Sequence, residues 1–245
     1  MQALDEAARV NVVAVLPDYW IERPPLRAGR TTEAAVDTFL HAADANGGRR
    51  LLDVDALLRE TPRVVRWQFL CGLAARRRIA FHGTGDPGIE RLEPREPVDV
   101  TPFGSQRAVF ATSDPIWAMF YAIVDRARHR LTLNNGCAVY EDTGEAFYYF
   151  SVSRQALVHR PWRTGYLYFL PADTFVEQPG EVYAGRRMRV PQLASPVAVT
   201  PFARLRVAPT SFPFLDRIRG HDDERLAEYA RAVMAAAPWP DSECT

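Results

Sequence analysis

The feature that most limits the possible folds of this chain is a series of short β-rich runs that begins at Ile79. Each run is rich in branched and aromatic residues, and Pro, Gly or Asn separates it from the next, which is typical of strands joined by turns. The runs follow one another instead of alternating with helices. This order favours an α+β fold with mainly antiparallel sheets over a doubly wound parallel fold. In chain order the runs are RIAFH, RAVFAT, GCAVYED, AFYYFSVS, GYLYFLP, EVYAG, SPVAVT and ARLRVAP.

Helical patterning occupies both ends of the chain. Before the first β-rich run, the segments TTEAAVDTFLHAADA, LLDVDALLRE and VVRWQFLCGLAARRR are predicted as helices. One further helix, DPIWAMFYAIVDRARHR, interrupts the strands behind Asp114-Pro115. We expect a helical N-terminal region over residues 1–77, a domain of two packed, mainly antiparallel sheets over 78–210, and a C-terminal helix and tail over 211–245.

The composition argues against several classes of protein. There are 30 basic and 30 acidic residues, a balance that argues against broad, unselective binding of nucleic acids. The 3 cysteines are far apart and odd in number, so neither a disulfide framework nor a zinc knuckle is expected. The N-terminus lacks a signal-peptide pattern, and no apolar run approaches about 18 residues. The sequence therefore predicts a cytoplasmic protein without a membrane partner.

The histidines do not form a metal-ligating pattern. No two of them are three or four residues apart, and the HExxH motif is absent, so no metal site is expected. The segment GHDDERL around His221 looks like the His-Asp doublet of metal-dependent phosphohydrolases. A helix N-terminus with acidic residues in its first turn explains this segment better.

The stretch RIAFHGTGDPGIERLEP carries Gly83, Gly85 and Gly88 at the GxGxxG spacing of dinucleotide-binding proteins. That motif needs a strand before the glycines and a helix after them. The strand is predicted, but prolines at positions 87, 94 and 97 interrupt the segment after the glycines, and no helical stripe is present there. The dinucleotide motif is therefore rejected. The stretch is either a glycine turn beside a core histidine, His82, or a different kind of nucleotide clamp.

A second motif lies further along the chain in FGSQRAVFATSDPIWAMFYA, where Phe110 on a predicted strand and Tyr121 on a predicted helix are 11 residues apart. Together with His82-Gly83-Thr84, this pairing resembles the ADP-ribosyltransferase superfamily, the fold of the diphtheria-type toxins and of the poly-ADP-ribose polymerases. In that family a first strand ends in His-Gly-Thr or His-Gly-Ser, and a second strand of the form aromatic-Ala-polar leads into a helix. The resemblance covers about residues 79–207.

The resemblance implies that NAD is the substrate and lies in a cleft between the two sheets. His82 and Thr84 would hydrogen-bond the adenosine-side ribose, and the backbone of Gly83 would reach the carboxamide of the nicotinamide. Phe110 and Tyr121 would stack on the flat, cationic nicotinamide ring. Core packing of these two aromatic side chains is the alternative. We expect the strands that carry His82 and Phe110 to be neighbours and both side chains to open into one cleft.

Gln192 and Glu181 compete for the third position of the family pattern, where active members often have a glutamate at the start of a late strand. In the family, that carboxylate stabilises positive charge on the reacting ribose. Gln192, in PQLASPVAVTPFARLRV, fits the layout better but supplies no anion. Glu181, in GEVYAG, supplies a carboxylate but lies 11 residues further from the closing strand.

The resemblance therefore implies a protein that cleaves the nicotinamide–ribose bond of NAD. It would transfer ADP-ribose to an unknown acceptor, which is a protein, a nucleic acid or a small molecule. A degenerate, non-catalytic module of the same fold is one alternative. An RNA 2′-phosphotransferase-like enzyme is another, because the His-Gly-Thr opening also occurs there. The basic cluster Arg186, Arg187 and Arg189 is either a solvated face or a contact for a phosphate-bearing acceptor.

Overall fold

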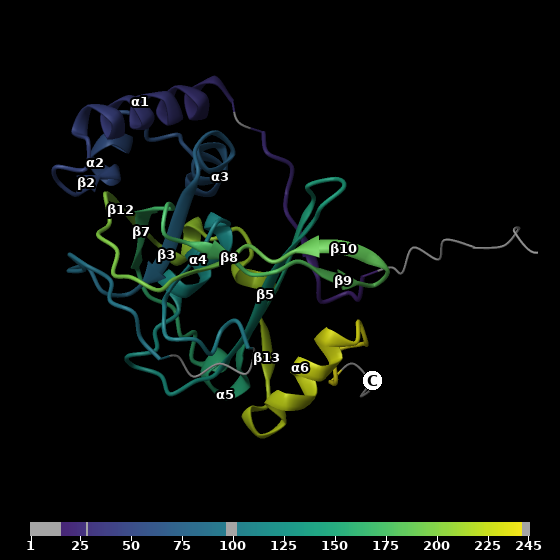
Figure 1. The fold of residues 1–245 in the computed structure, drawn as a ribbon. Helices are drawn as coiled ribbons and strands as arrows, with labels where there is room; N and C mark the ends of the chain where they lie inside the picture. Colours follow the sequence, from purple (N-terminus) through teal and green to yellow (C-terminus); the bar gives the residue numbers. More distant parts are fainter. Residues whose placement is uncertain (1–15, 28, 97–101, 242–245) are drawn as a thin grey trace, which may run out of the picture.

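The computed structural model describes residues 16–27, 29–96 and 102–241, which form two β-sheets with helices around and between them (Figure 1). Sheet A has the strand order β1-β6-β5-β10-β9, and β13 pairs with β6 outside this path. All of its pairs are antiparallel except that of β13 with β6. Its strands are β1 (Ile21–Glu22), β5 (Leu133–Tyr140), β6 (Ala146–Ser153), β9 (Glu181–Tyr183), β10 (Arg186–Arg189) and β13 (Arg219–His221).

Sheet B has the strand order β2-β12-β7-β3-β4-β11-β8. All of its pairs are antiparallel except that of β2 with β12. Its strands are β2 (Leu52–Asp53), β3 (Ile79–Thr84), β4 (Val109–Thr112), β7 (Gly165–Pro171), β8 (Val176–Glu177), β11 (Gln192–Ser195) and β12 (Ala203–Val207). The predicted α+β fold with two packed, mainly antiparallel sheets is confirmed.

Each segment that the sequence predicts to be helical contains a helix, with shifted ends, whereas α5 and the strand β13, which lies in the C-terminal segment, were not predicted. They are α1 (Arg30–Asn46), α2 (Val54–Leu58), α3 (Arg66–Arg76), α4 (Pro115–Ile123), α5 (Arg154–Val158) and α6 (Leu226–Met234), with 3₁₀ turns η1 (Pro209–Ser211), η2 (Leu215–Arg217) and η3 (Asp223–Arg225). Figure 1 shows α1 and α3 on one side of the molecule and α6 on the opposite side. The predicted C-terminal helix is therefore present.

Helix α4 begins and ends for identifiable reasons. The Asp114 carboxylate accepts the Trp117 N–H at 2.9 Å, which caps the helix, and Pro115 occupies its first turn. Asp114 is buried and also accepts a hydrogen bond from the Tyr148 hydroxyl at 2.7 Å. The helix stops sooner than predicted because the backbone becomes extended at Val124, which bridges to Trp162.

One hydrophobic core joins elements from the whole chain. Phe120 of α4 lies 4.8 Å, ring to ring, from Phe150 of sheet A, while Ala118 of the same helix packs on sheet B. The core also includes Phe39 of α1, Phe69 of α3 and Phe212 after β12. The regions 1–77, 78–210 and 211–245 thus all contribute to it, apart from residues 1–15, 28, 97–101 and 242–245, which lie outside the described residues.

The opposite face of sheet B has its own, smaller apolar cluster, which includes Ala80, Val109, Ala111, Tyr168 and Leu193. The segment after β3 contributes Ile89 and Leu92 to it and forms no helix through residue 96, in agreement with the rejection of the dinucleotide motif. The run SPVAVT is not the strand that the pattern predicts. The strand there is β11, which begins at Gln192 and ends at Ser195.

Candidate functional site

The strand order of sheet B places the three sequence motifs side by side. β3, which carries His82-Gly83-Thr84, lies next to β4, which carries Phe110, and β4 lies next to β11, which begins at Gln192. Thr112 of β4 pairs with Phe81 of β3 on one side and with Gln192 on the other. Residues far apart in the chain are therefore neighbours at this edge of the sheet.

The pairing of β3 with β4 is limited to one position, Phe81 with Thr112. Beyond it, Nδ1 of His82 lies 2.9 Å from the carbonyl oxygen of Phe110. A carbonyl only accepts, so Nδ1 carries the proton, and Nε2 of a neutral ring is an acceptor. Within the described residues, Nε2 has no hydrogen-bond partner. Burial lowers the pKa of His82, and although the bond to Phe110 opposes this effect, the ring is neutral near physiological pH.

Gly83 is a glycine because α4 approaches the strand closely. A Cβ atom at this position would lie 1.9 Å from the carbonyl oxygen of Ala118 and 2.9 Å from the amide nitrogen of Ala122. Gly165 of β7 makes the same kind of approach, with its Cβ position 1.9 Å from the carbonyl oxygen of Ala122. The two glycines form the surface on which α4 sits, which is a packing reason for a residue that the sequence assigned to ligand binding.

The backbone groups of Gly83 face the side of β4. Gly83 pairs with Leu167 of β7. Phe169 lies two residues after Leu167 on β7, and its carbonyl accepts the N–H of Phe202, which immediately precedes β12. Phe169 and Leu167 therefore direct their backbone groups toward β12. In an antiparallel ladder this makes Gly83–Leu167 a pair without mutual hydrogen bonds, so the Gly83 N–H and C=O point away from β7, toward the short β3–β4 ladder.

The predicted side chains divide between the two faces of sheet B. Successive side chains of a strand alternate in direction. Thr112 shares a face with its partner Phe81, so Phe110 and Gln192 lie on that face, which is the face that α4 covers. His82 and Thr84 lie on the other face, and His82 is half-buried between β3 and β4. The expectation that the side chains of His82 and Phe110 open into one cleft is therefore wrong, because the pairing of Phe81 with Thr112 puts them on opposite faces of the sheet.

Tyr121 lies on α4, next in sequence to Ala122, which packs on Gly83 and Gly165. Its side chain is 36% exposed, whereas the preceding Phe120 is fully buried, and the two rings lie 5.8 Å apart in an edge-to-face arrangement. Tyr121 is thus at the margin of the core and not inside it.

Gln192 is half-buried at the start of β11 and lies beside charged residues that sequence analysis did not single out for this site. Its carbonyl accepts the Gln178 N–H at 2.9 Å. Nη1 of Arg189 lies 2.5 Å from Oε1 of Glu177 and 3.3 Å from Oγ of Ser113, which follows β4. Glu177 is opposite Leu193, the residue after Gln192. No motif marks Glu177, because only the pairing of β8 with β11 places it there.

Glu181 lies in the other sheet. It is exposed on β9 of sheet A, where it pairs with Met188 and accepts a hydrogen bond from the Gln178 side chain at 3.3 Å. The basic cluster on β10 also divides. Arg186 pairs with Asp142 at 2.6 Å and Arg187 pairs with Glu141 at 3.0 Å, whereas Arg189 turns toward the start of β11.

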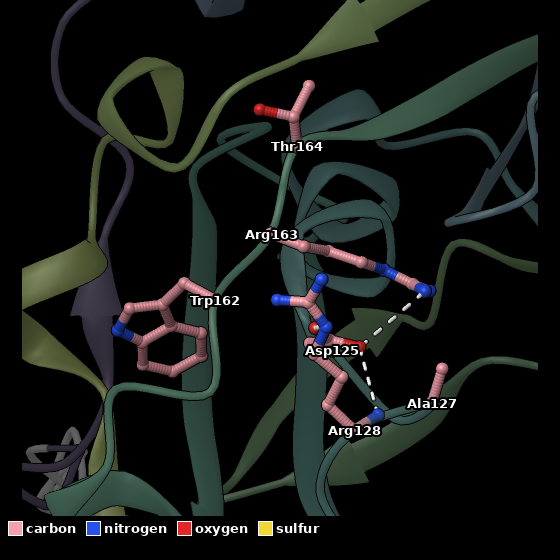
Figure 2. Close-up of a pocket in the computed structure, with 6 residues that line it drawn as sticks. All are labelled: Asp125, Ala127, Arg128, Trp162, Arg163 and Thr164. Carbon is pink, nitrogen blue, oxygen red and sulfur yellow. Dashed lines mark hydrogen bonds and ion pairs between the residues drawn. The ribbon is translucent and has the colours of Figure 1, made fainter.

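A polar hollow of about 460 Å³ lies where α4 ends and the chain approaches β7 (Figure 2). Asp125, Arg128, Trp162 and Arg163 are among its lining residues. The hollow adjoins the end of β3, because the guanidinium of Arg163 lies against Gly85, the residue after Thr84. Sequence analysis missed these residues, since nothing in RARHR or HRPWRT separates them from ordinary surface arginines.

His221 ends β13 in a closed environment. It is fully buried, and its two ring nitrogens lie 2.6 Å from Oγ of Ser151 and 2.7 Å from Oγ1 of Thr132. The Asp222 carboxylate accepts the Glu224 N–H and caps η3, which leads into α6. The interpretation of GHDDERL as a helix N-terminus is confirmed.

The described residues contain neither a metal-binding cluster nor a membrane-spanning helix. Among them, no group of three or more His, Cys, Asp or Glu residues is arranged to hold a metal ion. Over the same ranges, no helix is both long enough and apolar enough to cross a membrane.

Comparison with family models, curated proteins and solved structures found no match.

Proposed function

We propose that this protein binds NAD at the joined ends of β3, β4 and β11 and acts as an ADP-ribosyltransferase-like protein. It would cleave the nicotinamide–ribose bond and pass ADP-ribose to an acceptor. The observation that supports this proposal most is the adjacency of the three motif strands, because His82, Phe110 and Gln192 come from distant parts of the chain.

The end of β3 offers groups suited to a ribose and a carboxamide. Nε2 of His82 is an acceptor for a ribose hydroxyl, since Nδ1 donates to Phe110. The Thr84 hydroxyl accepts the Asp86 N–H at 3.2 Å, which leaves its own proton for a ligand oxygen. The backbone N–H and C=O of Gly83, directed toward β4, match the acceptor and donor of a carboxamide.

Phe110 and Tyr121 provide aromatic surface on the α4 side of the same strands. Both are only partly buried, so each ring retains area for a ligand. Stacking of nicotinamide between two rings would use its planar shape and its positive charge.

A second candidate, a non-catalytic binding module, is favoured by the residue at the third motif. Gln192 can orient a ribose hydroxyl but cannot stabilise a developing cation. Glu181 lies in sheet A, and Glu177 is engaged by Arg189 at 2.5 Å. A protein of this composition would bind NAD and release nicotinamide slowly or not at all.

The test combines calorimetric titration of NAD with chromatographic measurement of nicotinamide release. The native protein should bind NAD and cleave it slowly. Gln192→Glu should raise the cleavage rate by about tenfold or more, which corresponds to about 1.4 kcal/mol of barrier, while Glu181→Gln should have little effect. Rapid native cleavage that Glu181→Gln abolishes and Gln192→Ala does not would show that Glu181, and not Gln192, holds the third position. A native protein that does not bind NAD would overturn the proposal.

Tyr121→Ala and Phe120→Ala form a matched pair that separates binding from folding. Loss of a stacked ring at Tyr121 should weaken NAD binding by up to about tenfold. Phe120 is fully buried, so its truncation should lower the free energy of unfolding by roughly 3–5 kcal/mol. A Tyr121→Ala protein that unfolds as easily as Phe120→Ala, yet binds NAD normally when folded, would exclude a stacking role.

A further inference from the structure

The hollow at the end of α4 is built by two chain segments that hold each other in place. The Arg163 N–H donates to the carbonyl of Ile123 at 2.8 Å, and the Asp125 N–H donates to the carbonyl of Pro161 at 2.9 Å. These two backbone hydrogen bonds fix the backbone positions of Asp125 and Arg163, and so the points from which their side chains extend. Figure 2 shows both side chains, with that of Arg128, meeting in one place.

The guanidinium of Arg163 has hydrogen-bond donors that no described residue satisfies. It makes no side-chain hydrogen bond within the described residues, and its Nε is buried without a partner. Its ion-pair partner, Asp125, lies 3.8 Å away from Nη1 to Oδ1, which is beyond hydrogen-bond distance. An arginine has five N–H donors, and a buried donor without an acceptor costs free energy. Among the described residues, Nε of Arg163 therefore lacks an acceptor.

The carboxylate of Asp125 cannot neutralise the positive charge in the hollow, because two arginines share this one carboxylate. Nε of Arg128 lies 3.8 Å from the other carboxylate oxygen of Asp125, and that arginine side chain is 85% exposed. Asp125 also accepts the backbone N–H of Arg128 at 3.2 Å. Two guanidinium groups against one carboxylate leave a net positive charge, which favours an anion.

The position of Arg163 relates the hollow to the site on β3. A Cβ atom at Gly85 would lie 1.7 Å from Cζ of Arg163, so the guanidinium rests on the backbone directly after Thr84. Adjacent strand residues are about 3.3 Å apart along the chain, which puts Gly85 roughly 10 Å from His82. In NAD, the phosphates are joined to the adenosine-side ribose through a single methylene group, so they would fall within reach of Arg163.

We propose that this hollow is an oxyanion subsite that binds a phosphate group through the guanidinium of Arg163, with Arg128 as the second cation. A guanidinium presents two parallel N–H donors that match two oxygens of a phosphate. The proposal rests on the proposed NAD site only for the identity of the molecule that carries the phosphates. The subsite itself requires no more than a phosphate oxyanion.

The test is calorimetric titration of the full-length chain with inorganic pyrophosphate and, separately, with NAD. Arg163→Gln should weaken pyrophosphate binding by about tenfold or more, because it removes charge-assisted hydrogen bonds. Arg163→Lys, which keeps the charge but loses the paired donors, should give a smaller loss. Arg126→Gln is the matched control, since Arg126 is a nearby exposed arginine outside the lining of the hollow.

A variant at Gly85 tests the same contact without touching an arginine. Gly85→Ala should displace the guanidinium of Arg163 and weaken pyrophosphate binding while the protein still folds, because the clash is with the far end of a flexible side chain. Circular dichroism and thermal denaturation of each variant verify folding.

The outcomes separate the two proposals. Pyrophosphate binding that depends on Arg163, without any binding of NAD, supports the subsite and overturns the proposed function. Pyrophosphate binding that is absent, that Arg163→Gln leaves unchanged, or that Arg126→Gln weakens as much as Arg163→Gln does, overturns the subsite. Equal losses for both ligands in Arg163→Gln alone support the subsite as the place where the phosphates of NAD bind.

Discussion

Two strand ends in this protein carry a histidine beside a glycine, and they differ in how completely the histidine is bonded. β13 ends in Gly220-His221, where both ring nitrogens have hydroxyl partners and the side chain is fully buried. β3 ends in His82-Gly83-Thr84, where one ring nitrogen is bonded to the backbone of β4 and the other has no partner within the described residues. In sequence, both look like candidate site residues.

The difference lies in the neighbouring elements. At His221, the hydroxyls of Thr132 and Ser153 also donate to the Asp223 carboxylate, at 2.7 and 2.6 Å, so each polar group of the cluster satisfies another. A closed network of this kind stabilises the attachment of β13 and leaves nothing for a ligand. At His82, the short β3–β4 ladder leaves polar groups without mutual partners. The comparison indicates that a bonded histidine supports the fold, and an incompletely bonded one is available for binding.

The largest expected effect concerns the side of the β3 end on which α4 packs. Gly83→Ala should lower the free energy of unfolding by about 3 kcal/mol or more, because the new Cβ would meet the backbone of α4 at 1.9 Å and neither element can yield cheaply. Gly85→Ala should cost about 1 kcal/mol or less, because only a side-chain end moves. Urea denaturation measures both. Equal losses for the two variants would show that α4 does not pack on Gly83 as described.

The next effect compares the two histidines directly. His221→Ala should lower the free energy of unfolding by about 2–3 kcal/mol, because it leaves the buried Ser151 hydroxyl without its partner and creates a cavity. His82→Ala should cost about half as much, since one hydrogen bond at a half-buried position is lost. Denaturation curves for both variants decide the order. A larger loss for His82→Ala would reverse the assignment of the closed and the open strand end.

The smallest expected effect is a dependence of stability on pH. Burial lowers the pKa of His82 and of His221, so the unfolded chain binds protons more readily than the folded protein below about pH 6.5. Stability should therefore fall as the pH is lowered from about 7.5 to about 5, by at most about 1.4 kcal/mol per pH unit for each histidine. At His221, the nearby Asp223 opposes the lowering of the pKa.

Replacing each histidine by glutamine, which does not titrate, shows which histidine causes the dependence of stability on pH. His82→Gln and His221→Gln should each make the slope of unfolding free energy against pH shallower, and the double variant should make it shallower still. Chemical denaturation at a series of pH values gives the slopes. A slope that both single variants leave as steep as in the native protein would mean that other groups cause it.

The sequence by itself determined the class of fold and most of its elements. The consecutive β-rich runs with turn residues between them predicted two mainly antiparallel sheets, because strand periodicity and turn chemistry are local properties of the chain. The Asp114-Pro115 start of α4 was predicted for the same reason, and so was the absence of a helix after Gly83-Thr84-Gly85. Element ends were less certain, since α4 stops where Val124 pairs with Trp162, a contact that no local pattern encodes.

Only the tertiary structure decided which residues meet and what each one is bonded to. The register of β11 on β4 brings Gln192 opposite Thr112, while Glu181 goes to the other sheet, although the two lie only 11 residues apart in the chain. Gly83 is required by the approach of α4. The packing of two distant segments leaves Nε of Arg163 buried without an acceptor among the residues that the structure describes. Strand pairing, close packing and hydrogen-bond satisfaction depend on residues that are neighbours in space, so a one-dimensional pattern could propose the site but not its partners.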